Sequence, residues 1–502
     1  MTPYKRLVDG IKKILKSFEP SEVKPQTAIS TIVDTQTSTP VRIPRSAHTL
    51  SRKHISKSAL KVLYQLQSAG FQAYIVGGGV RDVLLGKQPK DFDVVTNALP
   101  EQVKGVFRNC RLIGRRFVLA HVYFGQEIVE VATFRASHHH QSEGNERVIE
   151  DGRIVRDNMY GTTVDEDANR RDFTFNALYY DISDFSILDY AKGMADLEAG
   201  IVRLIGDPML RYQEDPVRML RAVRFAAKLD FTIEASAAEP IPQLGGLLAD
   251  VPSARLYDEV LKLFLSGHGL KSFRYLRQYH LFEHLFQQTH DCMLENPKVL
   301  AMIEQVLSNT DERVAKQQSV NPAFLFAALL WSPILHVLPY HREEGLSEQD
   351  CLINAIQRVM NKQVKQVAIP KRISVTMQEI WLMQPRLLQR KNKRKRLLLI
   401  EHPRFRAAYD FLALRGVLDE EAREGADWWT QVLKNEAQPI VNAHAPALPH
   451  VAEETPVDLE KEELATGQIT THHPNIHKQP HHNRRKRRFY RRKNDNPSHT
   501  ES

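Results

Sequence analysis

Two aspartates separated by one phenylalanine, Asp91 and Asp93, have the spacing in this sequence that most directly suggests chemistry. The segment from Asp91 to Val95 alternates in character, which predicts a β-strand with both carboxylates on one face. Residues two apart on a strand lie about 6.6 Å apart at Cα, so the carboxylates can bracket hard cations. Carboxylate oxygens suit Mg²⁺, and no cysteine or histidine accompanies them. The pattern therefore predicts a magnesium site rather than a zinc site.

A glycine-rich turn precedes this acidic segment. Tyr74 to Val76 reads as a short buried strand, which ends at a run of three glycines beginning with Gly77 and Gly78. The backbone N–H groups of glycines can approach a phosphate closely, and Arg81 adds positive charge just behind them. A bare pair of aspartates is more often a solvated turn, but the adjacent glycines and arginine favour a phosphate and metal site.

Two common phosphate-binding motifs are excluded. The dinucleotide-binding fingerprint requires glycine where Asp82 stands, and a Walker loop requires serine or threonine where Gln88 stands. The stretch from Gly77 to Val94 instead resembles the active site of the polymerase-beta-like nucleotidyltransferases. Within them it is most similar to the class II branch, the tRNA nucleotidyltransferase/poly(A) polymerase family. The resemblance implies two Mg²⁺ ions at the aspartates and an ATP triphosphate at the glycine turn and its arginine.

Two segments could supply a third acidic group. Glu130 lies in the apolar run from Ile128 to Phe134, which predicts a strand that could neighbour the aspartate pair. The other segment, Arg170-Arg171-Asp172 followed by a phenylalanine, resembles the RRDF motif that closes the catalytic domain in this family. That resemblance implies nucleotide binding by the two arginines and an active-site role for Asp172. The motif favours Asp172, and strand geometry keeps Glu130 as the alternative.

A helix begins near Asp215, which we expect to be its N-cap, followed by Pro216 at the first helical position. Arg218, Arg221 and Arg224 recur every third residue, which alone would indicate a surface helix with a basic face. Asp215 and Arg218, however, place an acceptor beside a planar donor fork that can read a base edge. The segment resembles the EDxxR motif, with which family members select the incoming nucleotide without a template.

The stretch from Leu112 to Val122 resembles the one that separates bacterial poly(A) polymerases from CCA-adding enzymes, although Val118 replaces an expected basic residue. It implies a template-independent polynucleotide adenylyltransferase that adds AMP from ATP to RNA 3′ ends and so promotes RNA decay. The alternatives are a tRNA CCA-adding nucleotidyltransferase and a non-catalytic RNA-binding protein on the same fold. The intact Asp91 and Asp93 argue against the latter.

The chain of 502 residues is too long for one core. Helical periodicity without evident strands follows residue 251, so we expect an α+β fold: a polymerase-beta-like nucleotidyltransferase domain, then an all-α neck and body. The expected divisions are a flexible N-terminal segment at 1–50, a catalytic head at 51–190, a nucleotide-selecting neck at 191–250, a helical RNA-binding body at 251–436, and a disordered linker with a basic tail at 437–502.

The tail carries most of the net charge of +9. Its basic residues are Arg484, Arg485, Lys486, Arg487, Arg488, Arg491, Arg492 and Lys493. They predict contacts with RNA phosphates, and two embedded aromatic residues could stack on bases.

Three widely spaced cysteines argue against disulfides, and no run of eighteen apolar residues is evident. We therefore expect a cytoplasmic monomer, with RNA-decay or RNA-chaperone proteins as partners.

Overall fold

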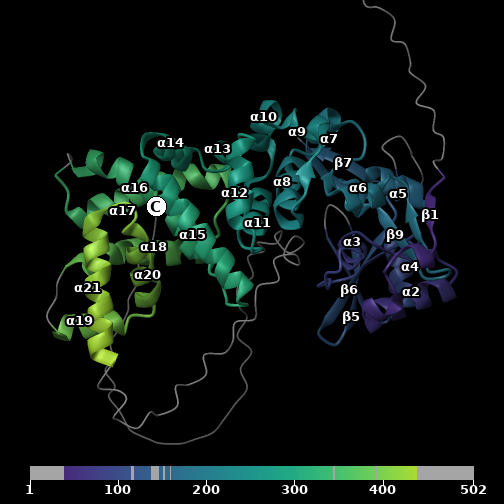
Figure 1. Cartoon of the computed structure of the whole chain (residues 1–502), viewed down its shortest axis with the longest axis horizontal. Coiled ribbons are helices and arrows are strands. Elements are labelled where there is room, and N and C mark those ends of the chain that lie inside the picture. Colours follow the sequence, from purple (N-terminus) through teal and green to yellow (C-terminus); the bar gives the residue numbers. More distant parts are fainter. Residues whose placement is uncertain are drawn as a thin grey trace, which may run out of the picture.

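The computed structural model describes residues 39–437, apart from 115–117, 137–145, 151–152, 159, 343–344 and 390–392. The molecule is elongated, with a mixed domain of strands and helices at one end and a purely helical body at the other (Figure 1). This arrangement confirms the expected α+β fold. The predicted basic tail lies outside the described residues.

The head, which the sequence predicts to be the catalytic domain, is built on one eight-stranded sheet in the order β1-β10-β9-β2-β3-β6-β5-β4. Only β3 and β6 are parallel among its neighbouring strands; the other pairs are antiparallel. The strands are β1 (Val41–Ile43), β2 (Ala73–Val76), β3 (Asp93–Thr96), β4 (Cys110–Ile113), β5 (Leu119–Phe124), β6 (Glu127–Thr133), β9 (Leu178–Asp181) and β10 (Ile187–Asp189). A separate hairpin comprises β7 (Glu146–Glu150) and β8 (Arg153–Asn158).

The two faces of this sheet bury different side chains. On one face, α2 (Lys57–Ser68) and α4 (Pro100–Val106) cover apolar residues that include Val94 and Val131. On the other, Val95 packs into a second, smaller core with α5 (Val164–Arg170). Because side chains alternate along a strand, the residues that precede Val94 and Val131 belong to this second face. Asp93 of β3 and Glu130 of β6 therefore lie on the side of the sheet with the smaller core.

The first strand lies inside the segment that we expected to be flexible. Val41–Ile43 pairs with β10 at the edge of the sheet, in register with Ile187–Asp189. Val41 is 64% exposed, so little apolar burial marks this strand in the sequence. Backbone pairing with β10 orders these residues, and the predicted N-terminal boundary at residue 50 is corrected to lie before β1.

After the head, the described chain is mostly helical. The neck contains α6 (Gly193–Ala199), α7 (Pro208–Glu214), α8 (Val217–Leu229), α9 (Ala235–Ala238), α10 (Ile241–Leu244) and a small pairing of β11 (Ile201–Val202) with β12 (Thr232–Ile233). The body begins with α11 (Ser253–Phe264), α12 (Gly269–Gln278), α13 (Phe282–Leu285), α14 (Gln287–Glu295) and α15 (Pro297–Ala315). It continues with α16 (Pro322–Arg342), α17 (Glu348–Gln366), α18 (Lys371–Leu388), α19 (Lys393–Ile400), α20 (Phe405–Arg415) and α21 (Glu420–Ala437).

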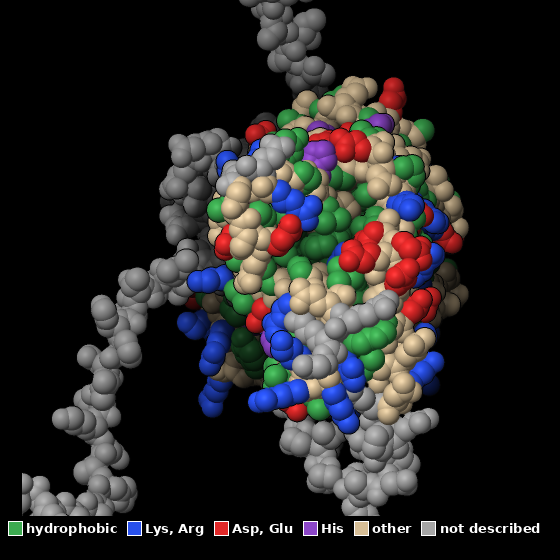
Figure 2. All heavy atoms as spheres, turned by 90° about the vertical axis from the view of Figure 1, so that its left-hand side faces the viewer, with side chains coloured by type: hydrophobic (Ala, Val, Ile, Leu, Met, Phe, Trp, Pro, Cys, Tyr) green, Lys and Arg blue, Asp and Glu red, His purple; other side chains and the backbone are tan. Residues whose placement is uncertain are grey.

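Helix α16 is long and apolar enough to cross a membrane by length and composition alone. Of its most apolar window, however, 61% is buried inside the structure. Figure 1 shows α16 packed among the other body helices, and α14, α17 and α18 contact it. Helix α16 is therefore the central core helix of the body. The far end of the body presents basic side chains along one edge (Figure 2), and α19, whose first turn is basic, lies at that end.

Trp381 on α18 offers a test of how the body is held together. Its side chain is fully buried, and its indole Nε1 donates to the carbonyl oxygen of Ala327 on α16 at 3.1 Å. Trp381→Ala should lower the free energy of unfolding by about 3–5 kcal/mol, because it leaves a cavity and removes the hydrogen bond to Ala327. Urea unfolding followed by far-UV circular dichroism measures this loss. Val375→Ala, at a 44% exposed position of the same helix, should change stability by less than about 0.5 kcal/mol. Equal losses in the two variants would contradict this account of the core.

Candidate active site

The glycine run joins β2 to α3 (Gly78–Leu84). The acidic segment at Asp91 packs against this run. Gly77 has φ of 71°, a left-handed conformation that favours glycine. A Cβ on Gly79 would lie 2.8 Å from the ring of Phe92 and 3.3 Å from the carbonyl oxygen of Asp91. Only a glycine permits this close approach. The third glycine therefore fixes the aspartate pair beside the turn.

Asp91 and Asp93 lie at the start of β3. The strand begins at Asp93, so Asp91 precedes it rather than belonging to it as expected. The side chain of Phe92 is buried between them, while Asp91 is half-buried and Asp93 is exposed. Both carboxylates thus remain accessible next to the glycine turn.

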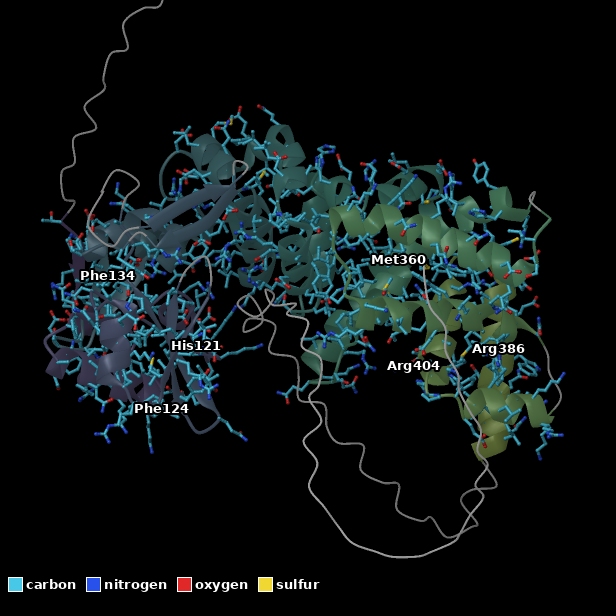
Figure 3. The ribbon with its side chains drawn as sticks, turned by 180° about the vertical axis from the view of Figure 1, so that it is seen from behind. His121, Phe124, Phe134, Met360, Arg386 and Arg404 are labelled. Carbon is cyan, nitrogen blue, oxygen red and sulfur yellow. The ribbon has the colours of Figure 1, made fainter. Side chains whose placement is uncertain are left out.

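Glu130 lies in the neighbouring strand on the same face as Asp93. The parallel register pairs Val94 with Val131, so the residues that precede them are also neighbours. Glu130 is opposite His121 on β5, and its Oε1 lies 3.4 Å from His121 Nε2. Figure 3 places His121 within the sheet of the head. The sheet therefore brings Glu130 close to the aspartate pair, as strand geometry predicted.

The donor set suits magnesium better than a closed metal cage. In the part of the chain that the structure describes, no group of three or more His, Cys, Asp or Glu side chains is close enough to hold a metal ion. Mg²⁺ is usually bound through one or two carboxylates together with substrate phosphates and water. Asp91 and Asp93, beside a turn that can receive phosphates, fit that requirement.

Asp172 is held by several groups of the protein. Its Oδ2 accepts from Arg221 Nε at 2.8 Å and Nη2 at 2.7 Å. Its Oδ1 accepts from the Phe173 N–H at 2.8 Å and from Asn176 Nδ2 at 3.2 Å. Although burial raises the pKa of Asp172, Arg221 and Asn176 lower it, and the resulting pKa is about 2. Asp172 is therefore ionised and links the head to α8 of the neck.

Arg81 is connected to Asp172 through the same asparagine. Its Nη1 donates to Asn176 Oδ1 at 2.9 Å, its Nε donates to Asp82 Oδ1 at 2.8 Å, and only 3% of the residue is exposed. A Cβ on Gly78 would lie 3.6 Å from Arg81 Nη2. The guanidinium therefore lies directly beneath the glycine turn, within a buried network, instead of projecting into solvent.

The two adjacent arginines have different surroundings. Arg171 donates to Asp167 Oδ2 from Nε at 3.0 Å and from Nη2 at 2.9 Å. Burial alone would lower the pKa of Arg171, but the charge of Asp167 raises it above its ordinary value. Arg171 Nη1 lies 3.7 Å from the position of a Cβ on Gly77. Arg170 instead donates to the carbonyl oxygen of Ala136 at 2.6 Å. Of the predicted pair, Arg171 is the one placed at the glycine turn.

The predicted base-reading pair lies between α7 and α8. Asp215 is the C-cap of α7, and Pro216 rather than Asp215 is the N-cap of α8. Arg255 on α11 donates to both oxygens of Asp215, at 2.9 and 2.8 Å. Arg218 Nη1 donates to Glu214 Oε2 at 2.9 Å. Each member of the pair is therefore oriented by a further charged side chain.

Sequence reasoning missed three of these supporting residues: Asn176, Asp167 and Arg255. Asn176 and Asp167 lie close to the RRDF motif, so a search for polar residues that must pair with its buried arginines could have found them. Arg255 lies on another helix, 40 positions from Asp215, and no local pattern marks it.

Three family models match the chain. The poly A polymerase head domain covers residues 73–203, and the probable RNA- and SrmB-binding site of polymerase A covers residues 230–293. The polymerase A arginine-rich C-terminus covers residues 344–493. The three matched regions follow one another along the chain without overlap.

Solved structures share the fold. A tRNA-processing enzyme in an apo form has a TM-score of 0.54 and 23% identity, covering 77% of this chain and 93% of that one. A tRNA nucleotidyltransferase complexed with a primer tRNA and an incoming ATP analog has a TM-score of 0.51 and 23% identity, covering 75% of this chain and 100% of that one. These structures confirm the expected nucleotidyltransferase fold.

Curated relatives distinguish the poly(A) polymerases from the CCA-adding enzymes as relatives of this chain. Poly(A) polymerase I of Salmonella typhimurium is 51% identical over 398 residues, which cover 78% of this chain and 85% of the relative. Poly(A) polymerase I of Haemophilus influenzae is 48% identical, covering 76% and 85%. A CCA-adding enzyme of Lactobacillus helveticus is 38% identical but covers only 43% of this chain and 52% of its own length. The chain belongs to the bacterial poly(A) polymerase I family.

Proposed function

We propose that this polynucleotide adenylyltransferase transfers AMP from ATP to the 3′-hydroxyl of RNA at the site formed by the glycine turn and the two aspartates. The observation that carries this proposal is the packing of Gly79 against Phe92, which holds the phosphate turn beside Asp91 and Asp93. The polymerase relatives, similar over most of their length, support adenylyl transfer over CCA addition. Non-catalytic RNA binding is disfavoured because both carboxylates remain accessible.

Asp91 and Asp93 would hold the metal, which we propose to be two Mg²⁺ ions. When bound, Mg²⁺ neutralises charge on the triphosphate and assists activation of the hydroxyl. The backbone of Gly77 and Gly78 and the guanidinium of Arg171 orient the triphosphate. The 3′-oxygen bonds to the α-phosphorus while the bond to the pyrophosphate oxygen breaks.

The hydroxyl proton leaves toward a carboxylate, and we propose Glu130 for this role because it lies beside Asp93 in the sheet. Glu130 then acts as the third acidic group of the reaction. Asp172 serves the active site in a different way: through Asn176 it positions Arg81 under the turn, and through Arg221 it fixes α8 against the head. Arg170 fixes the chain after β6, because it bonds to a carbonyl there.

Base selection is assigned to Asp215 and Arg218. An acceptor and a donor fork at fixed positions can recognise adenine in place of a template strand. Arg255 and Glu214 restrict the orientations of these two side chains, so a pyrimidine of different shape is not accommodated by rotation. We therefore expect ATP to be used and CTP to be used poorly.

RNA is the second substrate. The region at residues 230–293 matches a model described as a probable RNA-binding site, and the basic tail from Arg484 to Lys493 would add phosphate contacts. The three cysteines are free and buried, in keeping with a cytoplasmic protein. A monomeric state and partners among RNA-decay or RNA-chaperone proteins are part of the same proposal.

The proposed metal-binding carboxylates can be tested by substitution. Asp91→Ala and Asp93→Ala should each abolish AMP transfer, because each removes a metal ligand, while RNA binding stays unchanged because little RNA surface is lost. Primer extension with labelled ATP and RNA filter binding measure the two effects. Glu101→Gln, an exposed carboxylate on α4, is the matched control and should retain full activity. Substantial extension by either aspartate variant would contradict the metal assignment.

Substitutions of Asp172 and of Glu130 should each lower activity, and substitution of Asp172 should also lower the stability of the protein. Asp172→Ala should be severely impaired, and Glu130→Gln should lower kcat about 100-fold or more with ATP KM unchanged. Because the pKa of folded Asp172 is lowered to about 2, its ionised form adds stability above pH 4 that is lost as the pH falls toward 2. This contribution is about 2 kcal/mol.

Thermal unfolding of wild type and Asp172→Asn across this pH range measures the Asp172 contribution. The difference between them should shrink at low pH. If Asp172→Ala is nearly fully active and Glu130→Gln is inactive, the positioning role of Asp172 is wrong.

Arg255 provides the test of nucleotide selection. Arg255→Ala should reduce the preference for ATP over CTP roughly ten-fold, because Asp215 loses its bidentate partner. Arg255→Lys should also lose preference, since an ammonium cannot reproduce the planar fork. Single-nucleotide incorporation on an unstructured RNA, measured with each nucleotide in turn, gives the ratio. Arg313→Ala, an exposed arginine of α15, serves as the control. Efficient addition of C, C and then A to a truncated tRNA would instead identify a CCA-adding enzyme.

A further inference from the structure

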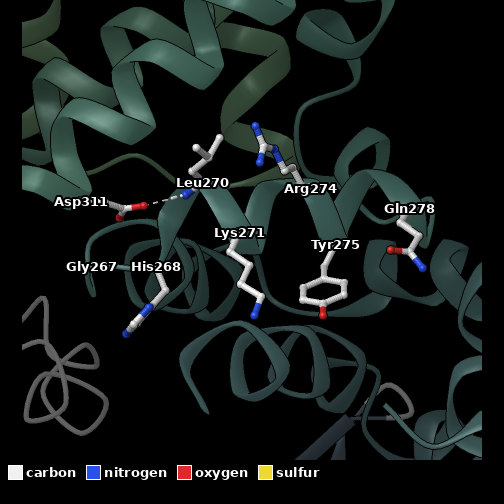
Figure 4. A pocket seen from close by; sticks show the side chains of 8 residues that line it. All are labelled: Gly267, His268, Leu270, Lys271, Arg274, Tyr275, Gln278 and Asp311. Carbon is white, nitrogen blue, oxygen red and sulfur yellow. Dashed lines mark hydrogen bonds between the residues drawn. The ribbon is translucent and has the colours of Figure 1, made fainter. Parts of the chain in front are cut away.

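A pocket of about 530 Å³ lies along α12, outside the active site described above. This volume falls within the range of pockets that hold small ligands. Asp311 on α15 accepts hydrogen bonds from the N–H groups of Gly269 and Leu270, at 2.7 and 3.0 Å, and so caps the start of α12. His268, Lys271 and Tyr275 point to one side of the helix, and Arg274 points to the other (Figure 4). The first side therefore combines cationic, aromatic and imidazole groups.

The pocket lining carries two cationic side chains, Lys271 and Arg274, against one carboxylate, Asp311. Asp311 is already engaged by the N–H groups at the start of α12. Two lysines outside the lining add positive charge: burial lowers the pKa of His268, Asp311 raises it, and the charges of Lys87, Lys228 and Lys271 lower it. Lys87 follows α3 in the head, and Lys228 is near the end of α8 in the neck. This excess of positive charge favours an anion.

The lysine on α12 can change partners at little cost. Lys271 forms an ion pair with Asp230, and the two side chains are 39% and 88% exposed. Ion pairs as exposed as this contribute little to stability. The ammonium of Lys271 can therefore turn to a phosphate without a large loss in the protein.

Two tyrosines add a surface for stacking beside these cations. Tyr275 on α12 and Tyr279, the C-cap of that helix, have ring centroids 6.3 Å apart and ring planes at 16°. Lys271 lies over the Tyr275 ring at 5.9 Å from its centroid. Cations that meet phosphates and aromatic rings that meet bases are the combination by which proteins bind single strands.

We propose that this pocket binds a nucleotide of the single-stranded RNA substrate upstream of its 3′ end, with its phosphate at Lys271 and its base against Tyr275, while the charges of Lys87 and Lys228 attract the strand from outside the lining. The inference rests on the proposed function, since RNA is taken to be the substrate. The proposal adds an RNA-binding position on the body of the protein. Lys87 of the head contributes positive charge near this position.

The position of Lys87 connects this pocket to the active site. Helix α3 starts at the glycine turn, has seven residues, and is therefore roughly 10 Å long. Lys87 follows the helix by three residues, so it lies within roughly 20 Å of the turn. A strand whose 3′ end is at the aspartates can thus reach the pocket after a few nucleotides. The contact would hold the RNA in register while its end is extended.

The test is binding of a short fluorescent oligoadenylate to the full-length protein without ATP, over a range of salt concentrations. Lys271→Ala should weaken binding and reduce the slope of log K against log salt by about 0.7, the value for one lost phosphate contact on a single strand. Lys87→Ala, outside the lining, should give a smaller reduction. Tyr275→Ala should weaken binding roughly ten-fold, whereas Tyr275→Phe, which keeps the ring, should bind like wild type.

Controls separate a binding role from a structural one. Lys298→Ala, at an exposed lysine of α15 outside the pocket, should leave affinity and slope unchanged. Lys271→Arg should restore the slope, and thermal midpoints should match that of wild type. Unchanged affinity and slope in Lys271→Ala and Tyr275→Ala would overturn the proposal.

The same nucleotide chemistry could come from free ATP rather than from RNA. Calorimetric titration with ATP alone distinguishes these sources: Lys271→Ala should bind ATP as wild type does. Loss of ATP binding with unchanged RNA binding would overturn the RNA assignment. Because the RNA measurement needs no catalysis, it also separates this pocket from the adenylyl transfer proposed above: loss of transfer alone would leave the pocket assignment standing.

Discussion

The ion pair between Asp172 and Arg221 joins the proposed phosphate-binding part of the protein to the part for which we propose base selection. Asp172 lies in the head and Arg221 on α8, and the pair is largely buried, with 13% and 28% of the two side chains exposed. A buried carboxylate without its cation is costly, so separation of head and neck is opposed at this point. Through Asn176 the same carboxylate supports Arg81 beneath the glycine turn. Movement of α8 would therefore be transmitted to the triphosphate site.

The other side of α8 is tied to the body by a second buried charge. Glu259 on α11 is 2% exposed and lies 3.6 Å from Arg224 and 3.4 Å from Lys262. Burial raises the pKa of Glu259, and the charges of Arg224 and Lys262 lower it, with a net lowering. The arginines of α8 thus have separate tasks: Arg221 faces the head and Arg224 faces the body. The basic face of this helix is an internal connector rather than a solvated surface.

The fold class could be predicted, and the residues of the proposed site could be placed near one another, because their signals are local. The glycine run, the aspartate pair and the strand carrying Glu130 lie within short segments whose alternation and turn chemistry are visible in the sequence. The edge strand at Val41 could not be predicted, because backbone pairing rather than apolar burial orders it. Arg255 could not be predicted either, because a partner on a distant helix leaves no periodic trace near Asp215.

A site that selects a nucleotide without a template needs side chains that are held in one orientation. Long side chains lose rotamer freedom when they are ordered, so a free aspartate and arginine would adapt to several bases. Here Arg255 grips both oxygens of Asp215 from α11, while Glu214 holds Arg218 from α7. The base-reading groups are thus fixed by the helices on either side of them. Because α11 belongs to the body, the proposed base selection by Asp215 and Arg218 would depend on the packing of the body against the neck. Under this proposal, nucleotide specificity is a property of the helical scaffold as much as of the two residues assigned to the base.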